Sequence, residues 1–180
     1  MALRKILTDS DPSLHKRCRP VEQFDQRLHN LIDDLKETLA NAGGAGLAAP
    51  QVGILRRVVI VVDAQDQMLE LVNPEIIQQD GEQDGFEGCL SVPDRWGKVK
   101  RPMHVVVRAQ DRNGAFFQVE GEEMVARCFC HEAEHLDGHL FTEHTDRLFT
   151  NEELDELLAA EEDGEGQEKP RRRRRRDRQE

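Results

Sequence analysis

The chain has 180 residues with a formal net charge of −11, and 34% of its residues are charged while only 4% are aromatic. This length favours one domain with a hydrophobic core of its own. No apolar run approaches the ~20 residues of a membrane-spanning helix, and the N-terminal residues are too polar for a signal peptide. We therefore expect a cytoplasmic protein without membrane association, whose four cysteines are thiols or metal ligands rather than disulfides.

The N-terminal third predicts two helices followed by an unusual loop. A short helix begins after Asp9 or Ser10, and a longer one spans residues 24–41, where apolar side chains recur at intervals of three and four. The loop over residues 43–51 consists of small and apolar residues up to Gln51, which is too apolar for a solvent-exposed linker. Because glycine permits close backbone approach, we expect this loop to pack against a ligand or against the wall of a metal site.

Strand signals dominate the middle of the chain. Asn73-Pro74 is expected to separate two strands, residues 85–93 form a tight glycine-flanked segment, and residues 111–114 signal a hairpin turn. Strands followed by helices, joined by short hairpins, predict an α+β fold with antiparallel sheets. The expected strands cover residues 57–63, 69–72, 75–79, 103–110 and 115–120.

The C-terminal part changes abruptly in charge. Residues 150–153, Thr-Asn-Glu-Glu, predict a capping box that opens a C-terminal helix. Residues 152–168 hold nine acidic groups and no basic group, whereas residues 169–180 carry a net charge of +6. Because this composition cannot build a core, we predict a folded domain over residues 1–160 and a disordered tail, first acidic and then arginine-rich, over residues 161–180.

A helix over residues 122–137 carries the most informative motif. No Pro or Gly interrupts it, and Gly138 follows as a natural C-terminal stop. His131 and His135 lie four residues apart and share one face of this helix, on a stripe that is otherwise apolar and therefore buried. With Glu132 they form the pattern H-E-x-x-H, typical of a hydrolase in which two histidines hold a metal and the glutamate acts on a water molecule beside it.

Such a centre needs a third protein ligand. Six residues after His135, where one group of metalloproteases has a histidine, this chain has Phe141. A downstream carboxylate, Glu152 or Glu153, is one alternative. Cys89 is the better candidate, because a thiolate binds borderline divalent ions well and leaves the fourth position open.

Three segments taken together resemble peptide deformylase. They are G-x-G-L-A-A-x-Q at residues 44–51, E-G-C-L-S at residues 87–91 and H-E-x-x-H at residues 131–135, in that order, and the resemblance covers about residues 1–160. It implies antiparallel sheets around the helix that carries the two histidines, with further helices at both ends. It also implies removal of the formyl group from the N-terminal formyl-methionine of nascent bacterial peptides.

The resemblance implies one divalent metal per chain, held by Cys89, His131 and His135. The ion expected in the cell is ferrous iron, with zinc, nickel or cobalt able to substitute. Glu132 is then expected to accept the proton of the attacking water and deliver it to the leaving amine. The side-chain amide of Gln51 and the backbone N–H of Leu90 are expected to stabilise the developing oxyanion.

Five residues are expected to contact the peptide substrate. Gly44 and Gly46 bring backbone close to the peptide, which is expected to bind as an added strand. Met124 and Cys128 precede His131 on its helical stripe, and we predict that they line a pocket for the methionine side chain, with Ala45 opposite.

The chain departs from the family pattern at two positions. Cys130 stands where the family usually has Gln, and Glu134 stands where it usually has Asp. We expect Glu134 to pair with Arg101, and we place Glu87 with them as residues that support the metal ligands from outside. Cys130 is expected to point away from the metal.

Two other functions remain open. The first is an H-E-x-x-H metalloprotease with a downstream glutamate ligand, and the second is a catalytically silent deformylase-like binding protein. The run Arg171–Arg176 also has two interpretations: contact with ribosomal RNA through counterion release, or a solubilising tail that folds back on the acidic residues. We expect a monomer.

Overall fold

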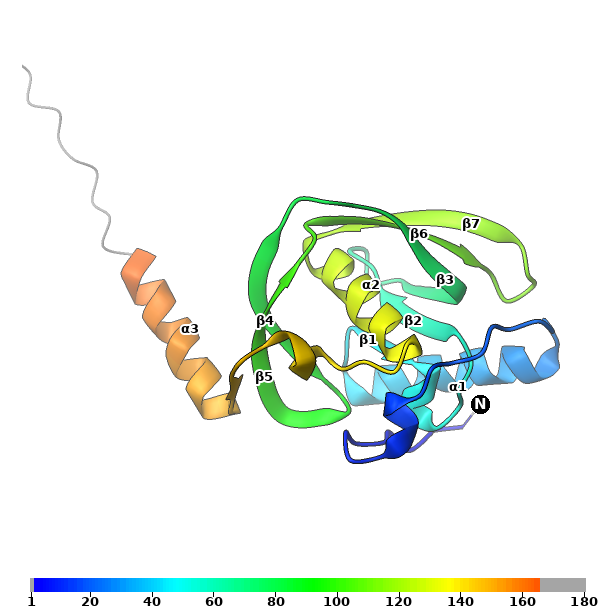
Figure 1. Cartoon of the computed structure of the whole chain (residues 1–180), viewed down its shortest axis with the longest axis horizontal. Helices are drawn as coiled ribbons and strands as arrows, with labels where there is room; N and C mark the ends of the chain where they lie inside the picture. Colours follow the sequence, from blue (N-terminus) through cyan, green and yellow to red (C-terminus); the bar gives the residue numbers. More distant parts are fainter. Residues whose placement is uncertain (1, 166–180) are drawn as a thin grey trace, which may run out of the picture.

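The computed structural model describes residues 2–165 and combines two antiparallel sheets with three α-helices (Figure 1). This confirms the predicted α+β class. In the described range the α-helices are α1 (Gln26–Ala42), α2 (Glu123–Leu136) and α3 (Asn151–Glu165), and the 3-10 helices are η1 (Pro12–His15), η2 (Ala49–Val52) and η3 (Phe141–His144). The strands are β1 (Gly46–Ala48), β2 (Val58–Val62), β3 (Met68–Asp80), β4 (Gln83–Cys89), β5 (Val92–Arg101), β6 (His104–Gln110), β7 (Phe116–Glu122) and β8 (Leu148–Phe149).

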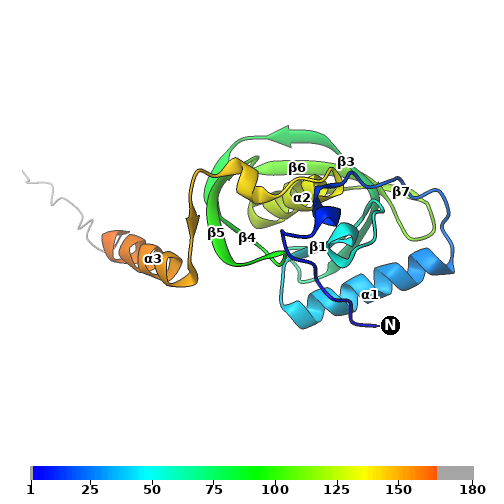
Figure 2. The ribbon, with the colours of Figure 1, turned by 60° about the horizontal axis from the view of Figure 1, so that its bottom comes forward.

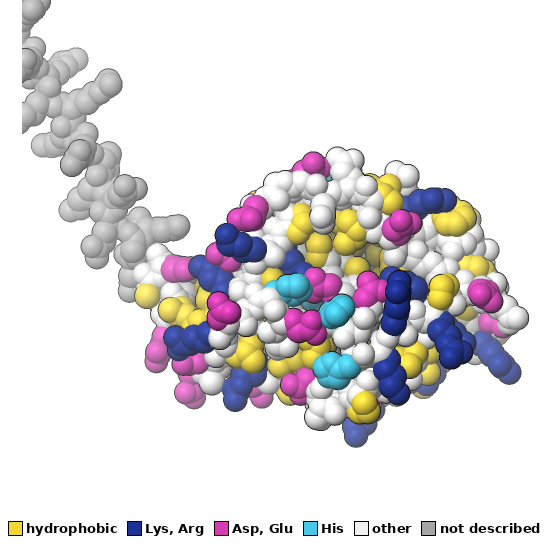
Figure 3. Space-filling view, viewed as in Figure 1, with side chains coloured by type: hydrophobic (Ala, Val, Ile, Leu, Met, Phe, Trp, Pro, Cys, Tyr) yellow, Lys and Arg dark blue, Asp and Glu magenta, His cyan; other side chains and the backbone are white. Residues whose placement is uncertain are grey.

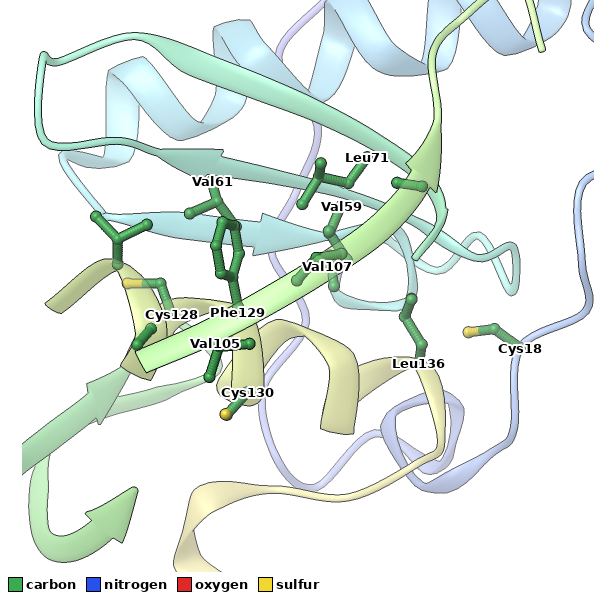
Figure 4. Packing of buried hydrophobic residues seen from close by; sticks show 14 residues of the cluster. Cys18, Val59, Val61, Leu71, Val105, Val107, Cys128, Phe129, Cys130 and Leu136 are labelled. Carbon is green, nitrogen blue, oxygen red and sulfur yellow. The ribbon is translucent and has the colours of Figure 1, made fainter. Parts of the chain in front are cut away.

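One sheet has the strand order β1-β2-β3-β6-β7 and the other has the order β4-β5-β8. Helix α2 lies between the long sheet and the β4–β5 hairpin, so that it is enclosed on most sides (Figures 1 and 2). Its apolar side chains pack on the long sheet, where Phe129 lies close to Val61 and Val105 (Figure 4). The helix that carries the H-E-x-x-H motif is therefore a central core element.

Strand β2 is apolar at every position because helices cover both of its faces. Val59 and Val61 belong to the core cluster around α2. Val58 and Ile60 belong to a second cluster, which the leucines of α1 complete on the other side of the sheet. The sheet is thus a fixed platform between α1 and α2.

Two expectations about strands were wrong. The strands predicted on either side of Asn73-Pro74 are one strand, β3, in which a register shift between Val72 and Glu75 absorbs the proline and Asn73 takes a φ of 50°. Residues 85–93 are not one tight segment but the end of β4, the turn at Leu90 and Ser91, and the start of β5. The glycines of β4 misled the prediction because they make room for neighbouring side chains rather than for a turn.

The predicted capping box at the start of α3 is confirmed. The backbone N–H of Glu153 donates to Thr150 Oγ1 at 3.2 Å, and the backbone N–H of Thr150 donates to Glu153 Oε2 at 2.9 Å. The helix continues to Glu165 and so includes the first residues of the segment expected to form the tail. A well-capped run rich in Glu and Ala favours helix. The run Arg171–Arg176 lies outside the described residues. Within residues 2–165, no helix is long and apolar enough to cross a membrane.

A cluster of ion pairs ties α1 to the long sheet and supplies a test of the fold. Glu70 on β3 accepts hydrogen bonds from Arg112 in the β6–β7 turn, at 2.6 and 2.8 Å, and from Lys36 on α1 at 3.0 Å. The hydrogen bonds from Arg112 outweigh partial burial and lower the pKa of Glu70 below its ordinary value of 4.5. The unfolded chain therefore binds the proton more readily, so the stability from Glu70 is present above about pH 4.5 and is lost as pH falls through the folded-state pKa.

We predict that Glu70→Gln lowers the free energy of unfolding by about 1 kcal/mol at pH 7, in the range of partly exposed ion pairs. At an acidic pH below the lowered pKa of Glu70, where both side chains are neutral, the difference from the parent chain should shrink. Urea unfolding at both pH values measures it. The exposed Glu75 on the same strand is the matched control, and an equal loss in Glu75→Gln would contradict the assignment.

Candidate active site

Three side chains that could hold a metal ion converge where α2 passes the end of β4. Cys89, His131 and His135 each offer one ligand atom, and these atoms all lie within 4.8 Å of one another. Cys89 Sγ and His135 Nε2 are 3.3 Å apart. Sulfur and nitrogen ligands of a tetrahedral zinc-type ion stand about 3.6 Å apart, so this donor set and spacing fit a divalent metal. Burial also lowers the pKa of His135 well below its ordinary value, which favours the neutral ring that a metal requires.

Glu87 fixes the orientation of His131. The Nδ1 atom of His131 lies 2.6 Å from Glu87 Oε1, so the ring donates there and Nε2 remains for a metal. Burial would raise the pKa of Glu87, but hydrogen bonds from His131 and Arg101 outweigh it, and the pKa lies well below its ordinary value. Glu87 is therefore a carboxylate. Phe141 stacks on the ring of His131, with ring centroids 5.9 Å apart.

Arg101 joins Glu87 to the surface of the molecule. It donates to Glu87 at 2.7 and 3.1 Å and to Glu134 at 2.6 and 3.1 Å, which confirms the predicted pair of Arg101 with Glu134. The extra methylene of Glu134 is accommodated because its carboxylate is partly exposed and also lies 3.0 Å from His144 Nε2. The departure from the family pattern thus keeps its ion pair.

Arg127 is a buried residue that sequence reasoning missed. Its Nη1 donates to Glu87 Oε2 and to the carbonyl of Val99, both at 2.9 Å. Two guanidinium groups, those of Arg101 and Arg127, therefore flank one buried carboxylate. The sequence did offer one sign of this role, because Arg127 is a single arginine in an apolar run on the buried part of α2. A buried charge needs an oppositely charged or hydrogen-bonding partner.

Glu132 is buried beside the ligands, with 4% of its surface exposed, and its Oε2 has no hydrogen-bond partner among the described residues. Burial raises its pKa to about 7. Gly46 on β1 lies directly against it, because a Cβ atom at residue 46 would overlap the Glu132 carboxylate. Gly46, expected to bring backbone close to the peptide, thus also makes room for Glu132.

Gln51 on η2 points its amide nitrogen at the ligand group. Its Oε1 accepts from the backbone of Ala48 at 2.9 Å, which turns Nε2 toward Ser91 Oγ at 3.1 Å and Cys89 Sγ at 3.6 Å. Ser91, also missed, donates its backbone N–H to Cys89 Sγ at 3.4 Å. Leu90 lies in the turn between β4 and β5, and its side chain packs against Gly44.

A pocket of about 570 Å³ opens beside the ligands, and all five residues predicted to contact substrate line it. Met124 is 59% exposed, so the expectation of a fully buried helical stripe was wrong at its first residue, which lies at the pocket wall. Cys128 is buried, and burial raises its pKa to about 12, so it offers a neutral thiol to the pocket. Cys130 packs in the core cluster instead, as expected (Figure 4). Lining residues that the sequence did not reveal include Phe86, Trp96, Arg127 and Asn151.

The family model for polypeptide deformylase matches residues 3–151. The chain belongs to the polypeptide deformylase family. A peptide deformylase of Caldicellulosiruptor bescii is 53% identical over 156 residues, which cover 87% of this chain and 93% of the relative. The crystal structure of the peptide deformylase from Thermotoga maritima matches with a TM-score of 0.78 at 35% identity, over 82% of this chain and 100% of that one. A Met-Ala-Ser bound crystal structure of the class I type b peptide deformylase from Acinetobacter baumannii matches with a TM-score of 0.75 at 32% identity, over 79% of this chain and 98% of that one.

The chain is therefore a hydrolase of protein biosynthesis that removes the formyl group from the N-terminal formyl-methionine of newly synthesised peptides and releases formate. The family is metal-dependent, and the Cys-His-His group of this chain suits that requirement. The family match ends at the first residue of α3, so most of that helix lies beyond it.

The contact between Gly46 and Glu132 yields a test. We predict that Gly46→Ala lowers kcat about 100-fold without loss of metal, because the added Cβ displaces the buried carboxylate by up to an ångström. Formate release and metal analysis of the same sample measure both quantities. The variant should also melt at a lower temperature than the parent chain, and this loss should disappear in the background of Glu132→Ala. A loss that persists there would contradict the proposed overlap.

Proposed function

We propose that this chain performs deformylation with a divalent metal held by Cys89, His131 and His135 and with Glu132 as the general base. The observation that carries the proposal is the convergence of one thiol and two imidazoles beside a buried carboxylate whose Oε2 lacks a partner. When bound there, such an ion lowers the pKa of a water molecule and polarises a carbonyl oxygen.

The roles of the surrounding residues follow from their positions. Glu132 takes the proton of the attacking water and delivers it to the amine that leaves. The Nε2 of Gln51 and the backbone N–H of Leu90 donate to the oxygen of the formyl group as negative charge develops there. Because the hydrogen bond from Ala48 fixes the Gln51 amide in advance, this donor needs no reorganisation during the reaction.

The pocket supplies the substrate contacts. Met124 and Cys128 form one wall for the methionine side chain, and Ala45 lies on the opposite wall. Strand β1 is at the edge of its sheet, so the peptide can add to it as a further strand near Gly44 and Gly46. The relative from Acinetobacter baumannii with Met-Ala-Ser bound supports a peptide of this kind in the pocket.

We propose ferrous iron as the ion in the cell, with zinc, nickel or cobalt able to substitute, since one thiolate and two imidazoles suit all of them. We also propose one catalytic unit over residues 1–160 that acts as a monomer in the cytoplasm, where nascent peptides emerge.

We predict that Glu132→Gln retains one metal per chain but lowers the rate of formate release by at least 1,000-fold, because the amide cannot accept the proton of the water. The assay uses a short formyl-methionyl peptide and anaerobic protein loaded with ferrous ion. Glu123→Gln, at an exposed site on the same helix, is the matched control and should retain most activity. Turnover that survives in Glu132→Gln would remove Glu132 from the role of general base.

Two alternative functions would give different results in metal analysis and in the formate assay. An H-E-x-x-H metalloprotease with Glu152 or Glu153 as ligand would keep its metal in Cys89→Ala, whereas we expect that variant to lose it. The carboxylate of Glu153 is already engaged with Thr150 and Arg147, which disfavours this alternative. A catalytically silent binding protein would release no formate even when fully loaded with metal.

For the arginine-rich tail we propose the plainer role, a solubilising segment that neutralises nearby acidic groups. Removal of residues 169–180 should then leave binding to ribosomes unchanged at every salt concentration. Loss of a salt-sensitive binding component would instead favour contact between Arg171–Arg176 and ribosomal RNA.

A further inference from the structure

One wall of the pocket comes from an element to which neither the motifs nor the catalytic roles assign a task. Helix α3 lies on the opposite side of the β4–β5 hairpin from α2 in both ribbon views (Figures 1 and 2). Its first residue, Asn151, nevertheless lines the same pocket as His131 and Glu132, together with Asp94 and Trp96 of β5. The pocket therefore extends from the metal helix to the start of α3.

The side chain of Asn151 forms hydrogen bonds with two residues of β5, Asp94 and Trp96. Its Oδ1 accepts the indole N–H of Trp96 at 2.8 Å, and its Nδ2 donates to Asp94 Oδ1 at 3.0 Å. Asp94 has a φ of 58°, a left-handed conformation that residues other than glycine seldom adopt and that needs support from its surroundings. One side chain thus fixes an unusual backbone turn and the orientation of an aromatic ring.

Trp96 packs against the strand that carries the metal ligand Cys89. A Cβ atom at Gly88 would lie 2.7 Å from the ring of Trp96, so the indole rests directly on the backbone of Gly88. The capping box of Thr150 with Glu153 sets the position of Asn151 in turn. A series of direct contacts therefore runs from the start of α3, through Trp96, to the residue before Cys89.

We propose that Asn151 is a positioning residue that holds Trp96 as a wall for the substrate residues that follow methionine. The proposal rests on the deformylase function proposed above. Met124 and Cys128 occupy the methionine wall, and a cavity of about 570 Å³ exceeds what one methionine residue fills. The side formed by Asp94, Trp96 and Asn151 is thus available to the next residues of the peptide.

The test compares two substrates, formyl-Met-Ala-Ser and formyl-methionine amide, with ferrous-loaded enzyme. In Asn151→Ala, we expect the KM for the tripeptide to rise about fivefold, the scale of one lost hydrogen bond, while kcat changes less than twofold. The KM for the amide should change less than twofold, because this substrate does not reach Trp96. Glu156→Ala, an exposed site on the same helix, is the matched control and should alter neither substrate.

Exchanging the amide of Asn151 with the carboxylate of Asp94 distinguishes a positioning role of Asn151 from a general loss of stability. Asn151→Asp keeps an acceptor for Trp96 but places a carboxylate against Asp94, so the KM for the tripeptide should rise. Adding Asp94→Asn restores a donor and an acceptor, and the KM should return to within about twofold of the parent value. Failure of this rescue would overturn the proposal.

Trp96 is the sole tryptophan of the chain, which provides a readout independent of turnover. Titration with the product Met-Ala-Ser should change its fluorescence emission, whereas methionine amide should not. Equal responses to both ligands would overturn the proposal even if the Asn151 variants failed to fold. No formate from either substrate, with metal present, would refute the proposed function instead, so the two failures are distinguishable.

Discussion

The active site depends on one buried carboxylate, that of Glu87. It accepts hydrogen bonds from His131 on α2, from Arg101 on β5 and from Arg127 on α2, and it belongs to β4 itself. A carboxylate in this environment is stable only because two guanidinium groups and a ring N–H replace its water. In return, the same four groups lock the metal helix onto the β4–β5 hairpin, where Cys89 also lies. Removing either arginine would take away one of the two buried cations that compensate this carboxylate.

Close backbone approach is the second constraint on the site. Gly46 lies against the carboxylate of Glu132, Gly88 against the ring of Trp96, and Gly44 against the side chain of Leu90. At each position a methyl group would occupy space that a functional side chain already fills. The glycines in the family motifs are thus explained by packing between distant segments, and none of these three has a positive φ.

The site also shows how a rigid core and a peptide-binding surface are combined. Helix α2 is fixed by apolar contacts with the long sheet, so its histidines and Glu132 have little freedom (Figure 4). The space-filling view shows acidic, basic and histidine side chains gathered on one face of the molecule (Figure 3). Helix α2 supplies one wall of the pocket, through Met124 and Cys128. The other walls come from strand ends and from the start of α3, which are elements that can differ between relatives without disturbing the Cys-His-His group.

The sequence by itself determined what depends on local spacing. The pairing of His131 with His135 follows from the period of one helix, and the apolar faces of α1 and α2 follow from the same period. The three ordered motifs were specific enough to indicate the family and its metal ligands. The break predicted at Asn73-Pro74 failed because a bulge within a well-paired sheet tolerates a residue pair that ends an isolated strand. Only the tertiary structure placed Arg127 on Glu87, Gly46 against Glu132 and Asn151 on Trp96. These contacts join residues 40 to 86 positions apart, and no local periodicity encodes which distant side chain fills a given space.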